Sequence, residues 1–412
     1  MARMNAAQIL SEPLSLPCGA TLPNRIAKSA MSEILAPNHA PTQGLCRLYR
    51  RWSEGGVGLS ITGNVMIDRR ALGEPDNVVL EDDRDLAAFE AWAAAGSTAG
   101  NALWMQLNHP GKQSPRFLSP ETVAPSAVPF GKVLEKGFAP PRALTEPEIE
   151  DLIQRFATSA SLAQRAGFGG VQIHGAHGYL VSQFLSPHHN VREDGWGGSP
   201  ENRARFVLAV YDAIRAEVGP AFPVSIKLNS ADFQRGGFAE EDSIDVMQQL
   251  QERGIDLIEV SGGTYESPAM TGWKSDRSKA REGYFLDFLE RARGALTVPL
   301  CITGGFRTPV GMAAAVEGAA DVVGLARTLA VQPEFPKQVL AGEEVASRVG
   351  RLTTGNRAID TISMLEVSWY ENQLARMADG KDPLPDMGAW RSVAASMWKQ
   401  GAGALRVRRA RG

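Results

Sequence analysis

Short apolar runs alternate with longer amphipathic segments through most of this chain. Eight apolar runs predict strands at residues 26–31, 59–66, 102–107, 170–174, 224–228, 257–260, 300–303 and 322–325. Helical spacing of apolar positions predicts helices at residues 43–54, 83–96, 146–166, 200–218, 240–253, 284–295, 309–318 and 333–340. Successive strand-then-helix units indicate a parallel sheet that closes on itself. We therefore predict an α/β fold, a (β/α)8 TIM barrel in a single domain.

A doubly wound open sheet is the structural alternative to the barrel. It normally uses fewer strands and places a glycine-rich phosphate loop directly after its first strand. No such loop follows residues 26–31, so the sequence favours the closed barrel.

Three stretches do not follow the repeat. Residues 14–22 alternate apolar and small residues around a glycine and predict a short N-terminal hairpin. Residues 109–145 are rich in proline and predict a long loop over the active face of the barrel. Residues 343–412 follow the last strand-helix unit. We therefore divide the chain into a barrel with its hairpin, 1–342, and a helical C-terminal extension, 343–412, that packs on the barrel or on a neighbouring subunit.

Composition narrows the class of protein. The chain has 412 residues, 43% of them hydrophobic, and a formal net charge of −3, which suits one large core and gives no reason to expect nucleic acid as a partner. The cysteines, Cys18, Cys46 and Cys301, form no CxxC pair, which argues against a disulfide framework or an iron–sulfur cluster. No segment approaches the ~18 uninterrupted apolar residues of a membrane span. We expect a cytoplasmic protein with no membrane contact.

Polar side chains gather at the predicted C-terminal strand ends, where a barrel of this type has its active site. Val171–Ile173 form an apolar run that delivers His174, His177 and Tyr179, three side chains able to donate hydrogen bonds and exchange protons. The last two strands end in small residues and an arginine, the pattern of a phosphate site: Gly304, Gly305, Phe306, Gly324, Ala326 and Arg327. Gln106 and Lys227 would meet a heterocycle, and a cation near N1 favours a reduced flavin.

At these residues the chain resembles the old yellow enzyme family of flavin-dependent ene-reductases. The matching motifs are PNRIAKSAMS (23–32), QLNHPGKQ (106–113), HGAHGYLVSQFLSPHHNVREDGWGGSPENRARF (174–206), SIKLNSADF (225–233), ITGGF (302–306) and VVGLAR (322–327). They occur in the family's order and cover nearly the whole predicted barrel. Two histidines before the tyrosine make the motif most similar to the bacterial branch. The iron–sulfur cluster motif of some larger relatives is missing.

The resemblance implies a role for each matching residue. His174 and His177 would bind a substrate carbonyl oxygen or an anionic phenol, and Tyr179 would protonate the substrate carbon opposite the hydride. FMN would be bound by residues at the strand ends, with Ser32 near N5 and Lys227 near N1: Ala30, Met31, Ser32, Gly63, Gln106, Lys227, Gly304, Gly305, Phe306, Gly324, Ala326 and Arg327. Three positions depart from the pattern, which commonly has Pro at Ala30, Cys or Thr at Ser32, and Arg at Lys227.

The resemblance predicts an FMN-dependent oxidoreductase that uses NADH or NADPH to reduce the activated C=C bond of an enone-like small molecule by ping-pong hydride transfer. Two alternatives stay open: the same flavin barrel performing an oxidative demethylation or dehydrogenation, and a barrel without redox function that binds a phosphorylated ligand. We expect a homodimer or homotetramer, as the family branch implies.

A metal centre is the less favoured interpretation of the two histidines. His174 and His177 lie three residues apart and could form a ligand pair, but no third ligand is evident at the right strand ends, so we predict no metal. The neighbouring His188 and His189 we interpret as structural.

Overall fold

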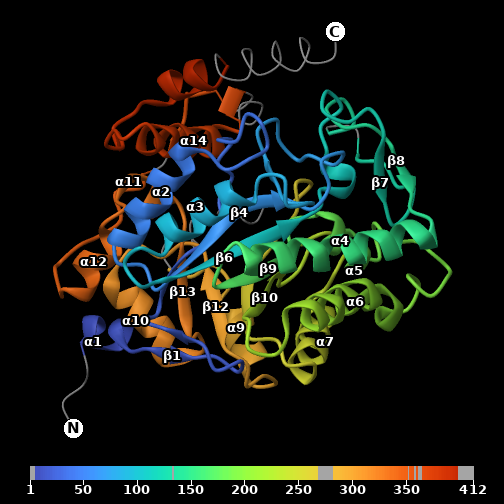
Figure 1. Ribbon diagram of the computed structural model, residues 1–412, viewed down its shortest axis with the longest axis horizontal. Coiled ribbons are helices and arrows are strands. Elements are labelled where there is room, and N and C mark those ends of the chain that lie inside the picture. Colours follow the sequence, from blue (N-terminus) through green and yellow to red (C-terminus); the bar gives the residue numbers. More distant parts are fainter. Residues whose placement is uncertain are drawn as a thin grey trace.

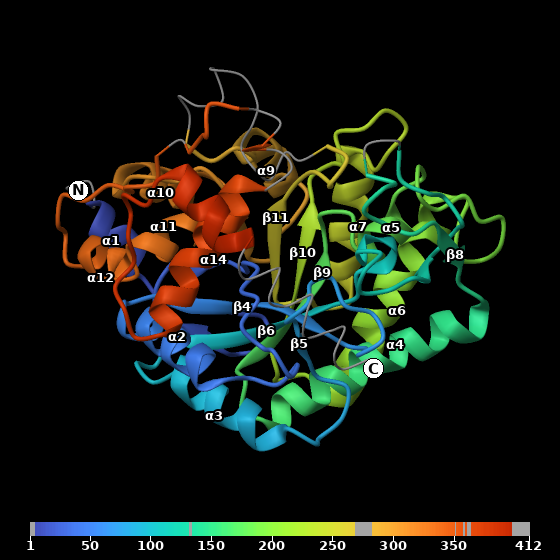
Figure 2. The ribbon, with the colours of Figure 1, turned by 90° about the horizontal axis from the view of Figure 1, so that it is seen from above.

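Eight parallel strands form a closed barrel in the computed structural model of the protein, which describes residues 5–131, 134–267, 282–350, 352–356, 359–360 and 364–397. The strands are β3 (Ile26–Lys28), β4 (Leu59–Met66), β6 (Ala102–Asn108), β9 (Gly170–Gly175), β10 (Val224–Asn229), β11 (Leu257–Ser261), β12 (Leu300–Thr303) and β13 (Val322–Leu325). They pair in chain order, and β13 pairs with β3 to close the ring (Figures 1 and 2). The predicted (β/α)8 barrel is confirmed.

Helices surround the strands as the apolar spacing predicted (Figure 2). They are α2 (Gln43–Glu54), α3 (Leu86–Gly96), α4 (Glu146–Arg165), α6 (Pro200–Val218), α7 (Glu240–Glu252), α9 (Leu286–Arg293), α10 (Pro309–Gly318) and α12 (Phe335–Leu340). N-cap hydrogen bonds define where three of these helices begin. The hydroxyls of Thr42, Ser199 and Thr308 each accept a hydrogen bond from the backbone N–H three residues later. The strand predicted at 26–31 ends at Lys28, and the helix predicted at 83–96 begins at Leu86.

Alternation along each strand separates an apolar outer layer from a mostly polar inner one. Every residue of β10 is buried. Val224, Ile226 and Leu228 pack in the apolar core shared with the helices, and the polar Lys227 alternates with them along the strand. Because successive strand side chains point to opposite faces, the buried polar residues face the barrel interior. Below them the interior is apolar, with Trp104 and Leu257 among its side chains.

The N-terminal hairpin covers that apolar end. β1 (Leu14–Ser15) and β2 (Thr21–Leu22) pair antiparallel, as predicted. Leu14, Leu16 and Leu22 are buried in one cluster with the lower barrel residues. The hairpin therefore closes the end opposite the site and leaves the C-terminal strand ends as the open face. A short helix, α1 (Ala6–Ser11), precedes it and packs on α10 and α12.

The segment 109–145 is more ordered than a plain loop. It contains a 3-10 turn, η1 (Gly111–Gln113), and two short strands, β7 (Thr122–Ala124) and β8 (Pro141–Ala143), which pair in parallel. Figure 1 shows them projecting from the barrel beside α4. The sequence did not predict these strands because each has only three residues. A further short strand, β5 (Val78–Val79), pairs with β4 outside the ring.

The C-terminal extension lies against the barrel's helices. α14 (Leu365–Ala378) contacts α2 and also α11 (Arg327–Val331), the short helix that follows β13 (Figure 1). Trp369 on α14 is buried, and its indole N–H donates to the carbonyl of Met387 at 3.0 Å. Within the described residues, no helix is both long and apolar enough to pass through a bilayer.

Candidate active site

The end of β9 brings His174, His177 and Tyr179 together. The ring centroids of His174 and His177 are 5.1 Å apart, and those of His174 and Tyr179 are 4.8 Å apart. His177 has φ +63° and Gly178 φ +79°, so the chain turns sharply here in a conformation that glycine adopts without strain. The backbone N–H of His177 donates to Asn229 Oδ1 at 3.1 Å, which fixes the turn to β10. The predicted triad is thus one cluster at the mouth of the barrel, meaning the C-terminal ends of its eight strands.

Both imidazoles are neutral at neutral pH. Burial lowers the pKa of His174 well below its usual value, and the nearby His177 and Lys227 lower it further. Burial is also the main cause that lowers the pKa of His177 to about 3, and the charge of Lys227 is the second. The N–H of Ala176 donates to His174 Nδ1 at 3.3 Å, so the proton of that ring sits on Nε2. His177 Nε2 lies 2.7 Å from Ser261 Oγ at the end of β11. Each ring therefore offers one N–H as a hydrogen-bond donor.

Tyr179 has a partner that the sequence did not identify. Its hydroxyl lies 2.9 Å from the hydroxyl of Tyr265, in the loop after β11. An isolated β-bridge between His177 and Thr264 holds that loop beside the triad. Burial raises the pKa of Tyr179 well above its usual value, and Tyr265 and Glu74 raise it further, so the phenol keeps its proton. Tyr265 belongs to none of the sequence motifs. The only sequence signal for it is its position shortly after the SGG run that ends a strand.

A buried polar network forms the floor of the site. Lys227 Nζ lies 3.1 Å from Glu259 Oε1, Thr303 donates to the same oxygen at 2.6 Å, and Gln172 donates to Glu259 Oε2 at 2.8 Å. Gln106 in turn donates to Gln172 at 2.7 Å. The predicted flavin contacts Gln106 and Lys227 are thus linked across four strands. Glu259 therefore gives the buried ammonium of Lys227 a partner within the protein itself.

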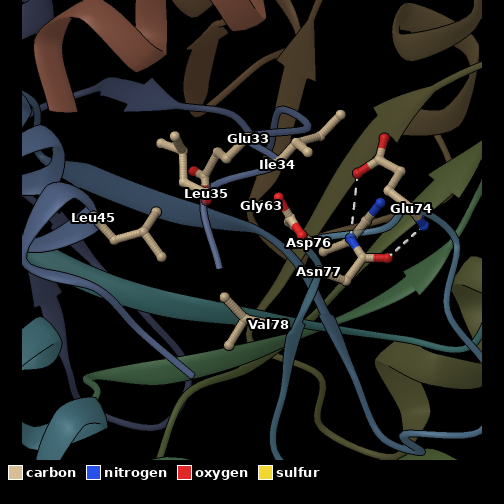
Figure 3. Close-up of a pocket in the computed structure, with 10 residues that line it drawn as sticks. Glu33, Ile34, Leu35, Leu45, Gly63, Glu74, Asp76, Asn77 and Val78 are labelled. Carbon is tan, nitrogen blue, oxygen red and sulfur yellow. Dashed lines mark hydrogen bonds between the residues drawn. The ribbon is translucent and has the colours of Figure 1, made fainter. Parts of the chain in front are cut away.

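Ser32 lies between two carboxylates at the same mouth. Its hydroxyl is 2.6 Å from Glu74 Oε1 and 2.9 Å from Glu371 Oε1, and Glu371 belongs to α14. Figure 3 shows Glu74 at a pocket whose lining also includes Glu33, Gly63 and Asn77. Asn77 holds Glu74 by accepting from its backbone N–H at 2.7 Å and donating to Oε2 at 3.2 Å. Met31 and Gly63 adjoin this group, since a Cβ on Gly63 would come within 2.5 Å of the Met31 carbonyl oxygen.

The ends of β12 and β13 fit a phosphate-bearing cofactor. Gly304 and Gly305 have φ of +123° and +87°, and a Cβ on Gly305 would lie 2.8 Å from the Tyr284 ring. Arg327 is the first residue of α11, and its Nη1 lies 2.6 Å from Oε2 of Glu366 on α14. At Gly324 a Cβ would collide with the hydroxyls of Thr303 and Ser29 inside the barrel wall. Its missing side chain permits packing. Phe306 is buried beside the glycines, and Ala326 is the N-cap residue of α11.

The buried hydroxyl of Ser230 supports the same fit. It has no hydrogen-bond partner among the described residues and lies 3.0 Å from the position of a Cβ on Gly262. A buried hydroxyl without a partner is costly and is explained by a ligand polar group. Gln106, Lys227 and Arg327 add an amide and two cations at the same strand ends, a set of groups that fits a flavin carrying a phosphate.

A second histidine cluster lies at the rim, where the ligand atoms of His188, His189 and Glu266 lie within 4.8 Å of one another. Lys112 Nζ lies 3.1 Å from His189 Nδ1. An ammonium only donates, so His189 accepts at Nδ1 and carries its proton on Nε2, which faces Glu266 Oε2 at 3.7 Å. A protonated nitrogen cannot ligate a metal. These contacts connect the segment after β6, which contains Lys112, to the loop that contains Tyr265 and Glu266. The arrangement agrees with a structural role for these histidines.

Comparison with known proteins identifies the family. Residues 10–345 match the sequence model of the NADH:flavin oxidoreductase / NADH oxidase family. The chain is 40% identical over 361 residues to the NADH-dependent flavin oxidoreductase iccE of Talaromyces variabilis, covering 82% of this chain and 87% of that protein. It is 40% identical over 364 residues to iliE of Hypocrea jecorina, with 81% and 90% covered.

A solved structure agrees with this identification. The old yellow enzyme homologue from Zymomonas mobilis superimposes with a TM-score of 0.70 at 26% identity, with 82% of this chain and 94% of that chain covered. The chain belongs to the NADH:flavin oxidoreductase / NADH oxidase family. It is an NAD(P)H-dependent flavin oxidoreductase of the old yellow enzyme type, with FMN as its cofactor. The alternative of a barrel without redox function is therefore set aside.

Proposed function

We propose that the protein reduces the activated C=C bond of α,β-unsaturated carbonyl compounds, with NADH or NADPH as the electron donor. The observation that carries this proposal is the cluster of His174, His177 and Tyr179, in which two neutral imidazoles and one neutral phenol share the mouth of the barrel. The pair of histidines before the tyrosine also supports placement in the bacterial branch, although the two fungal relatives above are 40% identical to the chain.

The chemistry that FMN would supply when bound is hydride transfer between the nicotinamide and the β carbon of the substrate. Ser32, Gln106 and Lys227 would hold the ring, and Gly305 with Arg327 would hold the phosphate. Lys227 and its partner Glu259 lie in the protein interior, so the ammonium keeps a fixed place on the floor of the site.

His174 and His177 would bind the carbonyl oxygen of the substrate. Negative charge develops on that oxygen as the hydride arrives, and two preorganised N–H donors stabilise it more than they stabilise the neutral carbonyl. His174 donates from Nε2, because Nδ1 accepts from Ala176. His177 can donate from Nδ1 when the hydroxyl of Ser261 donates to its Nε2. Ser261 would thus select the tautomer that catalysis needs.

Tyr179 would give its proton to the α carbon. Each turnover then adds one hydride and one proton to the alkene, and the phenolate that remains takes a proton back from solvent. The contact with Tyr265 orients the hydroxyl and delivers that proton. Because the raised pKa keeps Tyr179 protonated, the acid stays competent through neutral and mildly alkaline pH.

The decisive experiment is an anaerobic visible spectrum of the purified protein titrated with NADH or NADPH and then with cyclohexenone. We expect flavin bands that bleach with the nicotinamide and return with the enone. Bands that return only with oxygen would contradict the substrate class, and a profile of demethylated or dehydrogenated products would favour the oxidative alternative.

Replacing Tyr179 with phenylalanine tests the proton donor. The rate at which the enone reoxidises the reduced enzyme should fall by about 10²–10⁴-fold, the usual contribution of a general acid. Flavin reduction by the nicotinamide should be nearly unchanged, because that step needs no such proton. Tyr265→Phe keeps the acid and loses only its partner, so it should show a smaller loss. Equal reoxidation rates in Y179F and the wild type would assign the proton to solvent.

A further inference from the structure

One imidazole, that of His189, links two loops at the rim of the barrel. Its Nδ1 lies 3.1 Å from Nζ of Lys112 in η1, and its Nε2 faces Oε2 of Glu266 at 3.7 Å. His189 itself lies between α5 (Leu180–Leu185) and α6. We call Lys112, His189 and Glu266 the rim bridge. It joins the segments that follow β6, β9 and β11, which are remote from one another in sequence.

Charge decides the order of donors and acceptors along the rim bridge. Burial lowers the pKa of Lys112 to about 8, against the charge of Glu266, so the ammonium keeps its proton at pH 7. Burial, with Lys112 and His188, lowers the pKa of His189 to about 3, so the imidazole is neutral. A neutral ring that accepts at Nδ1 presents its N–H from Nε2. The ring dipole therefore points its positive end at the carboxylate. At 3.7 Å this contact is longer than a hydrogen bond, so the attraction is between charge and dipole.

Both charged ends of the rim bridge also hold the long loop after β6. Lys112 Nζ donates to the carbonyl of Val128 at 3.0 Å and lies 4.4 Å from the centroid of the Phe130 ring. At the other end, the backbone N–H of Gly131 donates to Glu266 Oε1 at 3.2 Å. Each end is therefore fixed by a contact besides the one to the imidazole.

Glu266 and Tyr265 are the two central residues of one tight turn. The N–H of Thr264 donates to the carbonyl of Ser267 at 3.0 Å, and the N–H of Ser267 donates to the carbonyl of Thr264 at 3.1 Å. A turn closed in this way leaves its central residues little freedom to move apart. The β-bridge from Thr264 to the turn after β9 anchors one side, and Glu266 anchors the other. Tyr265 lies between these anchors, with its hydroxyl 2.9 Å from that of Tyr179.

We propose that the rim bridge is a positioning element for the proton donor: Lys112 and His189 hold Glu266, and Glu266 holds Tyr265 against the hydroxyl of Tyr179. The inference rests on the proposed function, in which Tyr179 protonates the substrate. The three residues act through Tyr265 and are not catalytic residues themselves. Their effect on the reaction follows because proton transfer requires the donor to lie within hydrogen-bond reach of the accepting atom in the right orientation.

A double-mutant cycle in the holoenzyme tests whether Glu266 acts through Tyr265. Reoxidation of the reduced protein by cyclohexenone is followed by stopped flow in the wild type, Glu266→Gln, Tyr265→Phe and the double variant. We expect E266Q to slow this step by about fivefold or more, within the usual coupling of residues in contact, and to add no further loss in the Y265F background. Reduction of the flavin by the nicotinamide should stay unchanged. Glu193→Gln is the matched control, because it removes an exposed glutamate from the loop that also contains His189.

Two replacements of His189 test the imidazole. Leucine has no polar atom and breaks the contacts on both sides, so H189L should slow reoxidation as E266Q does. The amide of glutamine offers one acceptor and one donor, as the neutral ring does, so H189Q should recover most of the rate. The two residues lie in different segments, so a folding failure of E266Q leaves the histidine variants informative.

Three kinetic results would overturn the proposal. The first is an equal loss from E266Q with and without the Tyr265 hydroxyl, since Glu266 would then act by another route. The second is a loss in both half-reactions or in E193Q, which would indicate general damage to the fold. The third is a wild-type rate in H189L.

Fluorine NMR of the holoenzyme gives a reading that needs no turnover. The six tyrosines are replaced by 3-fluorotyrosine, and the variants Y265F and Y179F identify two of the resonances. We expect E266Q and H189L to shift the resonance of Tyr265 and to leave that of Tyr211, on α6, unchanged. An unshifted Tyr265 resonance in both variants would overturn the proposal. A protein that reduces no enone would contradict the proposed function, and the Tyr265 resonance would still decide whether the rim bridge holds this residue.

Discussion

The double replacement of His174 and His177 by alanine should lower kcat/KM for an enone by about 10³-fold or more, because loss of one preorganised oxyanion donor costs roughly 10²–10³-fold. The two rings lie 5.1 Å apart and act on one oxygen, so the losses need not add. Stopped-flow reoxidation of the reduced enzyme by cyclohexenone measures the effect directly.

The same variant should still fold, bind FMN and accept electrons from the nicotinamide. His188→Ala is the matched control, since His188 lies in the same segment but is exposed. Binding of a phenol, read from its charge-transfer band with oxidised flavin, should weaken in the double variant and not in the control. Enone turnover within about threefold of the wild type would remove the basis of the assigned carbonyl site.

Lys227→Met should destabilise the protein strongly. It removes the cation paired with Glu259, a carboxyl with no exposed surface, and breaking a buried pair typically costs about 3–5 kcal/mol. The bound flavin should also become harder to reduce, because the cation assigned to N1 is gone. Urea unfolding at pH 8 measures the loss of stability, and a midpoint-potential titration measures the effect on the cofactor.

The stability loss should depend on pH in a defined direction. Burial alone would raise the pKa of Glu259, but Lys227 and the hydrogen bonds from Thr303 and Gln172 outweigh it and hold the pKa below its usual value. The wild type therefore gains stability from Glu259 above the unfolded pKa of about 4.3 and loses it as pH falls through the folded pKa. In K227M the carboxyl can take a proton, so the difference between the two proteins should shrink toward pH 4.

The double variant K227M/E259Q separates the two effects. It removes both charges, so most of the stability should return while the flavin potential stays lowered. A potential that returns with the stability would show that Lys227 acts through packing and not on the flavin. A K227M protein as stable as the wild type at pH 8 would contradict the prediction, since Glu259 would then not depend on Lys227 for its stabilisation.

The cluster of two histidines and a tyrosine, to which we assign the chemistry, could be predicted from the chain because its members are local. His174, His177 and Tyr179 fall within six residues at the end of one apolar run, and two glycines mark the turn that exposes them. The floor network was only half predicted. In the sequence, Gln172 and Glu259 are isolated polar residues within apolar strands. In the structure, the alternation of side chains places both inside the barrel with Lys227, where they form one hydrogen-bonded network.

The sequence by itself determined the barrel, the hairpin, the order of the strands and the residues that end them, since period-two and helical spacing are properties of neighbouring positions. Only the tertiary structure decided which remote groups share a site. Tyr265 reaches Tyr179 across 86 positions, and Glu371 reaches Ser32 across 339. No local pattern encodes such pairs, because closing the ring brings together strand ends that the chain itself keeps far apart.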